Sequence, residues 1–121
     1  MKKILYLIFA SFAIMTWQAC EYDWLETEPV ILPDEVSFAG DILPIFEARC
    51  VTCHSTGGIE PDLSAANAYT DLFAKGQIDL IVPENSILYT SMAPGGNMNN
   101  YTIAGDAALV LKWIQEGAVN N

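Results

Sequence analysis

The feature that most constrains this chain is the sequence CVTCH, Cys50 to His54, which holds two of its three cysteines and its only histidine. At 121 residues the chain has room for one domain, since single cores typically hold roughly 100 to 150 residues. The folded part, of about 84 residues, is marginally stable unless disulfides, a metal or a cofactor add to its core. With so few cysteines, a disulfide framework is not available, so we expect another group to fill the core.

Four kinds of site use cysteines at this spacing. A structural zinc site needs four ligands, and the domain has no cysteine or histidine beyond Cys50, Cys53 and His54. A thioredoxin-like redox pair would follow a strand, whereas the residues before Cys50 have a helical pattern. A disulfide across this short loop would add little stability. Two cysteines three apart with an adjacent histidine match covalent attachment of a haem, with the histidine as proximal iron ligand. The motif therefore favours a single haem c as cofactor.

Residues 1–19 have the pattern of an export signal, because Lys2 and Lys3 precede an apolar run from Ile4 to Met15. This run is shorter than the roughly 20 residues that a spanning helix needs. The signal ends just before Cys20, and this arrangement resembles the lipid-attachment site of bacterial lipoproteins. We therefore expect an exported protein on the periplasmic or cell-surface side, anchored to a bacterial membrane by a lipid on Cys20. The alternative is a plain secretory signal that leaves Cys20 as a free thiol.

Residues 20–36 show no helical or alternating apolar pattern, which predicts an acidic, flexible tether that becomes ordered towards its end. The whole chain has 15 acidic and 5 basic residues, and removal of the signal would leave three basic residues and a formal net charge of −12. Nucleic acid is excluded as a partner, since phosphate binding needs clustered Lys and Arg. The acidity suits a partner protein with a basic docking surface, or serves only to keep the domain soluble.

Residues 37–121 are predicted to form an all-α domain. Apolar residues at helical spacing predict helices over about 40–49, 65–74 and 106–116, and the sequence PENS at 83–86 opens a short fourth helix. Strand signals are few, and the best is the segment 78–82. In the short helix Ile87 and Leu88 are expected on the inner side. The predicted core consists of Ile42, Phe46, Leu63, Leu72, Leu88 and Trp113.

Together these features resemble a single-haem class I cytochrome c and, with Cys20, the small cytochrome c lipoproteins of Gram-negative bacteria. The resemblance covers about residues 37–118 and rests on ILPIFEARCVTCH, EPDLS, PENSILYTSM and LVLKWIQEGAVNN. It implies small helices packed around one covalently attached haem, with opening and closing helices that cross and bring Phe46 towards Trp113. It also implies that the Pro61 carbonyl accepts a hydrogen bond from the imidazole of His54. Without the resemblance, Pro61 is equally well explained as the start of a turn.

The sixth iron ligand is expected to be a methionine, because the chain offers no second histidine. Met92 and Met98 both lie in SMAPGGNMNN, where glycines and a proline allow a loop to reach the iron. We predict Met98, which lies just ahead of the last helix, where the family commonly places its ligand. Met92 is the alternative, since the residues after it resemble a ligand motif of some relatives, although helix packing also explains it. Further alternatives are that neither methionine binds, or that Lys75 or Lys112 replaces them.

Ligation by histidine and methionine implies electron transfer, and we predict a membrane-tethered electron carrier, not an enzyme, that docks briefly on a redox partner. The sequence has no phosphate loop, Ser/His/Asp set or paired-carboxylate site that would indicate hydrolysis. An alternative is an open sixth position that makes the domain a small-ligand sensor or a peroxidase-like site. Its hydrogen-bond donors would come from Asn85, Asn97, Asn99, Asn100 and Tyr101. A third alternative is an interaction module whose haem mainly supports the fold.

Overall fold

The computed structural model describes residues 30–103 and 105–121. The predicted signal, Cys20 and most of the predicted tether lie outside the described residues. Within them the chain forms helices joined by loops, with no strand, so the all-α prediction is confirmed for this part of the chain. No helix in this part is long and apolar enough to cross a membrane.

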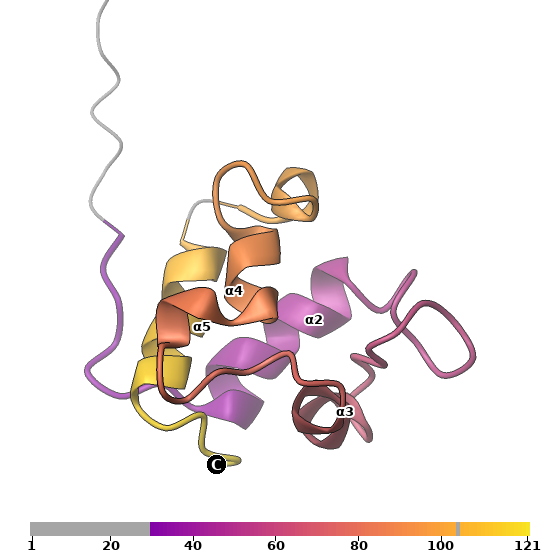
Figure 1. Ribbon diagram of the computed structural model, residues 1–121, viewed down its shortest axis with the longest axis horizontal. Helices are drawn as coiled ribbons and strands as arrows, with labels where there is room; N and C mark the ends of the chain where they lie inside the picture. Colours follow the sequence, from indigo (N-terminus) through magenta and orange to yellow (C-terminus); the bar gives the residue numbers. More distant parts are fainter. Residues whose placement is uncertain (1–29, 104) are drawn as a thin grey trace, which may run out of the picture.

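The helical segments of the described residues are joined by loops of different lengths (Figure 1). They are η1 (Phe38–Ile42), α2 (Leu43–Arg49), α3 (Ala68–Ala74), η2 (Pro83–Asn85), α4 (Ile87–Met92), η3 (Asn99–Tyr101) and α5 (Asp106–Gln115). The π-helix η1 runs directly into α2, and α5 packs against both η1 and α4. The opening and closing helical segments η1 and α5 therefore pack together, as the resemblance implied.

The opening helix begins earlier than the predicted residue 40, and the reason is local. The Ser37 hydroxyl accepts a hydrogen bond from the Gly40 amide at 3.1 Å, and the Ser37 amide donates to Asp41 Oδ2 at 2.8 Å. These two contacts cap the helix at Ser37, in the way that serine caps commonly do. Pro44 lies in the first turn of α2, where it costs no hydrogen bond.

Two other predictions differ from the structure. Helix α3 starts at Ala68 instead of about 65, because Asn67 and its neighbours form a turn in which the Asn67 amide donates to the Ser64 carbonyl. Residues 78–82 do not form a strand, and that prediction was wrong. The Asp79 carboxylate accepts hydrogen bonds from the amides of Ile81 and Val82 at 2.8 and 2.9 Å. These amides are therefore used in a local turn and are not available to a sheet.

All six predicted core residues are buried, and Phe38 and Met92 join them. The Phe38 ring lies 5.2 Å from the Trp113 ring and 6.4 Å from the Phe46 ring, between centroids. The predicted approach of Phe46 to Trp113 therefore involves Phe38, which contacts both. The Trp113 indole N–H donates to the Val119 carbonyl at 2.9 Å, so this buried polar group has a partner.

The carboxyl terminus of the chain is bonded to the start of η1. The Phe38 amide donates to Asn121 Oδ1 at 2.8 Å, and the Ala39 amide donates to the Asn121 carbonyl at 2.9 Å. Nearby, the amide of the buried Val36 donates to Glu116 Oε2 at 2.8 Å. Hydrogen bonds from Lys112 and from Val36 hold the pKa of Glu116 below its usual range. The last residues of the predicted tether therefore pack on the domain.

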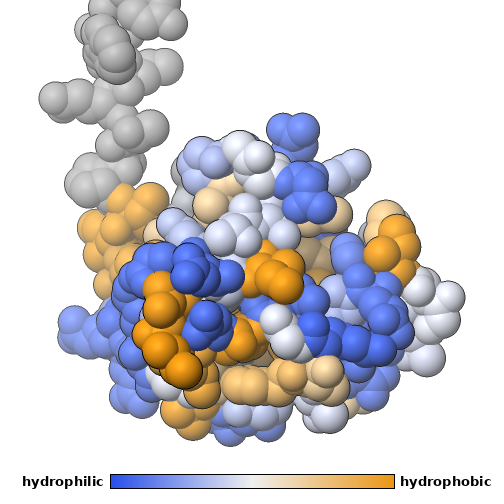
Figure 2. Space-filling view, viewed as in Figure 1, coloured by the Kyte–Doolittle hydropathy of each residue, from blue (hydrophilic) through white to orange (hydrophobic). Residues whose placement is uncertain are grey.

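Apolar side chains also reach the surface, in separate patches among hydrophilic ones (Figure 2). One group is Leu80, Ile81 and Val82 in the turn before η2, where Ile81 is 92% exposed. Exposed apolar residues are normal in small domains when they are scattered.

Candidate functional site

A cavity of about 480 Å³ lies between the CVTCH segment, helix α4 and the segment that contains η3. This volume falls within the range of about 300–1,000 Å³ that is typical of small-molecule and cofactor sites. Its lining brings together the predicted haem-attachment residues Cys50, Cys53 and His54 with the predicted ligand Met98 and its alternative Met92, which lie far apart in the sequence. The lining residues are Arg49, Cys50, Cys53, His54, Ile59, Glu60, Pro61, Leu63, Gln77, Ile87, Leu88, Ser91, Met92, Asn97, Met98, Tyr101 and Thr102.

The two cysteines reach the cavity because the chain turns tightly after α2. The amides of Cys53 and His54 both donate to the Cys50 carbonyl, at 3.1 and 2.8 Å. Cys50 is half-buried and Cys53 is exposed, and both are free thiols, not a disulfide. Burial raises the pKa of the Cys50 thiol, and nearby Asp106 raises it further, while Arg49 acts in the opposite direction. Both thiols are thus accessible to a group in the cavity.

A glycine closes the loop that carries the cysteines. A Cβ at Gly58 would lie 2.5 Å from the Cys53 carbonyl oxygen and 3.0 Å from that of Ser55. Backbone atoms cannot move aside easily, so only glycine fits at this close approach. The Gly58 amide donates to the Ser55 carbonyl at 2.7 Å, which holds the turn in place.

His54 is held in one tautomer by its contact with Pro61. The His54 Nδ1 atom lies 3.2 Å from the Pro61 carbonyl oxygen. A carbonyl oxygen can only accept a hydrogen bond, so Nδ1 carries a proton, and in the neutral ring the lone pair is then on Nε2. The predicted hydrogen bond between these residues is therefore present, and Nε2 is the ring atom that could bind a metal.

The loop that contains Pro61 is fixed by side-chain hydrogen bonds to Asp62. Ser64 donates its amide to Asp62 Oδ1 at 2.9 Å, Thr56 donates its hydroxyl to Oδ2 at 2.7 Å, and Asn67 donates its amide group to Oδ2 at 2.8 Å. Hydrogen bonds from Ser64, Thr56 and Asn67 hold the pKa of Asp62 well below its usual range. The Asp62 carboxylate therefore links Thr56, Ser64 and Asn67 and holds the loop together.

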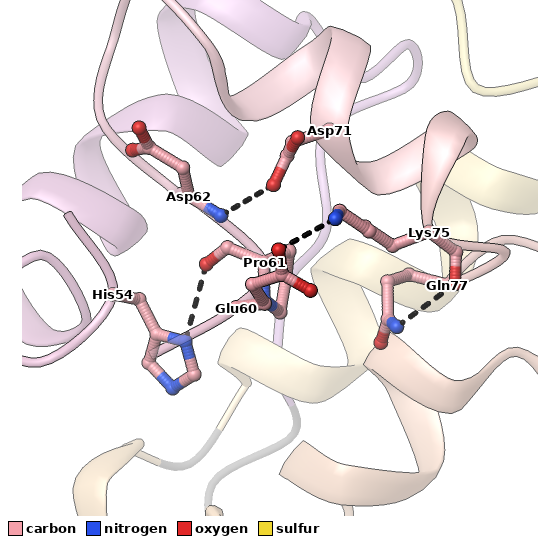
Figure 3. A network of polar contacts seen from close by, with 7 residues as sticks. All are labelled: His54, Glu60, Pro61, Asp62, Asp71, Lys75 and Gln77. Atoms are coloured by element: carbon pink, nitrogen blue, oxygen red, sulfur yellow. Dashed lines mark hydrogen bonds and ion pairs between the residues drawn. The ribbon is translucent and has the colours of Figure 1, made fainter. Parts of the chain in front are cut away.

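Helix α3 supports the same loop from outside (Figure 3). Asp71 Oδ2 accepts a hydrogen bond from the Asp62 amide at 2.7 Å, and Lys75 Nζ lies 2.6 Å from Glu60 Oε1. The hydrogen bond to Glu60 raises the pKa of Lys75. Two side chains one helical turn apart thus contact the residues on either side of Pro61.

Both candidate methionines line the cavity, but they differ in burial. Met92 ends α4, is 3% exposed and packs in the hydrophobic core. Met98 is half-buried in the following loop, and its amide donates to the Ser91 carbonyl at 2.9 Å. A Cβ at Gly96 would lie 2.2 Å from the Ser91 carbonyl oxygen, so glycine allows the loop to pass directly over α4. This close approach brings Met98 to the cavity.

Other predicted residues are divided between the cavity and the rest of the molecule. Asn97 and Tyr101 line the cavity, and so do Leu63 and Leu88. Ile87, predicted on the inner side, is 51% exposed, but it too lines the cavity. The other predicted residues are not in the lining. They are the donors Asn85, Asn99 and Asn100, the alternative ligands Lys75 and Lys112, and the core residues Ile42, Phe46, Leu72 and Trp113.

Arg49, which was not among the predicted site residues, is the one Arg or Lys side chain in the lining that the described residues form. Its Nε atom lies 3.3 Å from Asp106 Oδ2, and the Asp106 side chain is 10% exposed. This ion pair joins the end of α2 to the start of α5. The signal that could have found Arg49 is its place directly before Cys50.

Residues 30–103 and 105–121 contain no group of three or more His, Cys, Asp and Glu side chains arranged to hold a metal ion. Comparison of the chain with protein-family models, with curated proteins and with solved structures found no match.

Proposed function

We propose that the domain binds one haem c, covalently attached through Cys50 and Cys53, and that it transfers electrons. One observation carries this proposal: a single cavity is lined by both thiols, by His54 and by both candidate methionines. The fit is chemical as well as spatial. The cavity offers two free thiols, an imidazole with an available Nε2, and thioether sulfurs, which is the donor set of a c-type site.

Several residues that line the cavity have defined roles in this proposal. Cys50 and Cys53 would form the thioether links, and His54 would bind iron through Nε2. The Pro61 carbonyl fixes the orientation of the His54 ring through Nδ1. Arg49 supplies the positive charge that suits a carboxylate group of the cofactor. When bound, the haem supplies a one-electron redox centre, and the chain tunes and insulates it.

We propose Met98 as the sixth ligand. Its loop position leaves its side chain half-buried at the cavity, whereas Met92 is already used in core packing. Thioether ligation favours the reduced state relative to two histidines. Leu63 and Leu88 line the cavity and lower the local dielectric, which disfavours the additional positive charge of the oxidised state.

The partner in this proposal is a redox protein with a basic docking surface, because the chain carries 15 acidic and 5 basic residues. We further propose that the protein is exported and lipid-anchored through Cys20 to a bacterial membrane, on its periplasmic or cell-surface side. This part is supported by the sequence of residues 1–20.

The test is the visible absorption spectrum of the matured protein in its oxidised and reduced states. We expect a low-spin haem in both states and, when oxidised, the weak far-red band of a methionine–iron bond. Met98→Ala should remove that band, and Met92→Ala should keep it. A matured protein without a haem spectrum would contradict the whole proposal, and loss of the band in Met92→Ala alone would assign the ligand to Met92.

A second function is favoured by the polar residues of the cavity. Ser91, Asn97, Tyr101 and Thr102 all line it, and their hydroxyl and amide groups are the donors that a small bound ligand would need. If no methionine binds, the same site would act as a small-ligand sensor or a peroxidase-like centre. A high-spin spectrum that shifts on addition of carbon monoxide would favour this function over electron transfer.

A further inference from the structure

We propose that Asp71 is a positioning residue for His54 and that it acts through the peptide group between Pro61 and Asp62. This inference rests on the proposed function, since it concerns His54 as a ligand of the haem iron. It adds a residue from a different helix to the site, and that residue does not line the cavity.

The geometry is a chain of two hydrogen bonds that share one peptide group (Figure 3). The carbonyl oxygen of this peptide belongs to Pro61 and accepts a hydrogen bond from His54 Nδ1 at 3.2 Å. Its N–H belongs to Asp62 and donates to Asp71 Oδ2 at 2.7 Å. The carboxylate, the peptide and the imidazole are thus connected in series.

The two bonds reinforce each other for an electrostatic reason. A carboxylate bonded to a peptide N–H pushes electron density towards the carbonyl oxygen of the same peptide, because hydrogen bonds in series polarise one another. The N···O distance of 2.7 Å is at the short end for a charge-assisted bond. A more negative Pro61 oxygen is a stronger acceptor for the His54 Nδ1 proton. His54 Nε2 then becomes a more basic ligand atom.

Helix α3 is held firmly enough to place this carboxylate. Ala68 and Leu72, on either side of Asp71, are both fully buried in the core. The Asp71 amide donates to the Asn67 carbonyl at 2.8 Å, and Asn67 in turn bonds the Asp62 side chain. The position of Asp71 is therefore set by the core packing of α3, and Asn67 links the start of this helix to the loop.

A more basic histidine ligand stabilises ferric iron, so the charge on Asp71 lowers the midpoint potential. We expect Asp71→Asn to shift the ferric/ferrous equilibrium about threefold towards the ferrous form, which is a rise of about 28 mV for a one-electron couple. Asparagine keeps the shape and an oxygen acceptor but removes the charge. Asp71→Ala removes the acceptor as well and should raise the potential at least as much.

The matched control is Glu60→Gln, which removes one negative charge from the residue next to Pro61. The Glu60 side chain lines the cavity and pairs with Lys75, but it is 71% exposed and is not one of the groups bonded in series to His54. Its effect on the potential should be clearly smaller, because solvent and salt screen exposed charges. Equal shifts in Glu60→Gln and Asp71→Asn would overturn the proposal, since charge alone would then account for the effect.

A second readout is the magnetic resonance spectrum of the reduced protein, which reports the bonds without electron-transfer activity. In the wild type we expect slow hydrogen exchange at His54 Nδ1 and at the Asp62 amide, and a scalar coupling across the Asp62–Asp71 hydrogen bond. In Asp71→Asn both proton resonances should move while the Asp62 amide stays protected. Because the coupling is measured on the wild type, it decides the question even if a variant fails to mature.

The outcomes separate this inference from the proposed function. A wild type without a haem spectrum would overturn both. A wild type with a normal spectrum, but with no coupling across this hydrogen bond or with a potential that Asp71→Asn leaves unchanged, would overturn the role of Asp71 alone.

Discussion

The two sides of the cavity are built by different means. On the side of His54, Asp71 of α3 and Lys75, which caps that helix, contact Asp62 and Glu60 of the loop. On the side of Met98, the contacts are mostly local turns, such as the bond from its amide to the Ser91 carbonyl. The loop beside one candidate ligand is therefore fixed by side chains from a neighbouring helix, and the other candidate ligand is held by backbone contacts of its own loop.

This difference indicates which half of the site should tolerate substitution. Local turns open at a lower free-energy cost than segments that are also held by side chains of another element. We therefore expect the histidine side to behave as a rigid half of the site. The methionine side should adapt more readily to substitution and to added ligands.

The largest expected effect comes from removing the candidate ligand on the rigid side. His54→Ala should lose the low-spin spectrum completely in both oxidation states, because no other histidine exists in the chain. Met98→Ala should keep His54 bound and gain the ability to bind carbon monoxide when reduced. Absorption spectra with and without carbon monoxide distinguish the two. A wild-type spectrum in His54→Ala would show that His54 is not a ligand of the iron.

A second prediction separates the two methionines by stability. Met92→Ala should lower the free energy of unfolding by about 2–5 kcal/mol, which is usual for truncation of a buried methionine. Met98 is half-buried, so Met98→Ala should cost clearly less packing energy. Urea denaturation of both variants at one pH gives the comparison. Equal losses would mean that the Met98 loop is as well packed as α4.

Acid should weaken the histidine side first. The hydrogen bonds to Asp62 hold its folded-state pKa below the unfolded value of about 3.9. Their contribution to stability is therefore complete above about pH 4 and is lost as the pH falls through the folded-state pKa. We expect the urea midpoint of the wild type to fall below pH 4, and Asp62→Asn to start lower at neutral pH but to lose less on acidification.

The control for that prediction is Glu47→Gln, which removes an exposed carboxylate from α2. Its acid dependence should match that of the wild type. If Asp62→Asn and Glu47→Gln showed the same profile, the acid effect would reflect net charge, and the network around Asp62 would have no special part in it.

The smallest expected effect lies on the methionine side. The Thr102 hydroxyl donates to the Asn99 carbonyl at 3.0 Å, and Thr102→Val keeps the shape while removing this donor. The loss should be about 0.5–1.5 kcal/mol in the free energy of unfolding, the usual net value of one hydrogen bond. Thr90→Val removes a hydroxyl that donates to the Ser86 and Ile87 carbonyls at the start of α4, and it serves as the control. When each is combined with Met98→Ala, Thr102→Val should change the affinity for carbon monoxide, and Thr90→Val should leave it unchanged.

Much of the helical structure could be predicted from local patterns. The apolar spacing predicted α5 to within a residue, and Gly117, with φ of 99°, ends it as a carboxyl-terminal glycine would. The segment 78–82 could not be predicted in this way. Its β-branched residues suggested a strand, but the Asp79 side chain bonds the local amides and prevents pairing.

The sequence by itself determined the chemistry that the site can offer, because the identity of Cys50, Cys53 and His54 and their spacing do not depend on the rest of the fold. Only the tertiary structure decided which distant residues join them. Met98, Tyr101 and Arg49 reach the same cavity, and Asp71 reaches the peptide behind His54, through the packing of α3, α4 and α5. The physical reason is that helical periodicity reports which face of an element is buried, whereas the neighbours of that face are chosen by long-range packing.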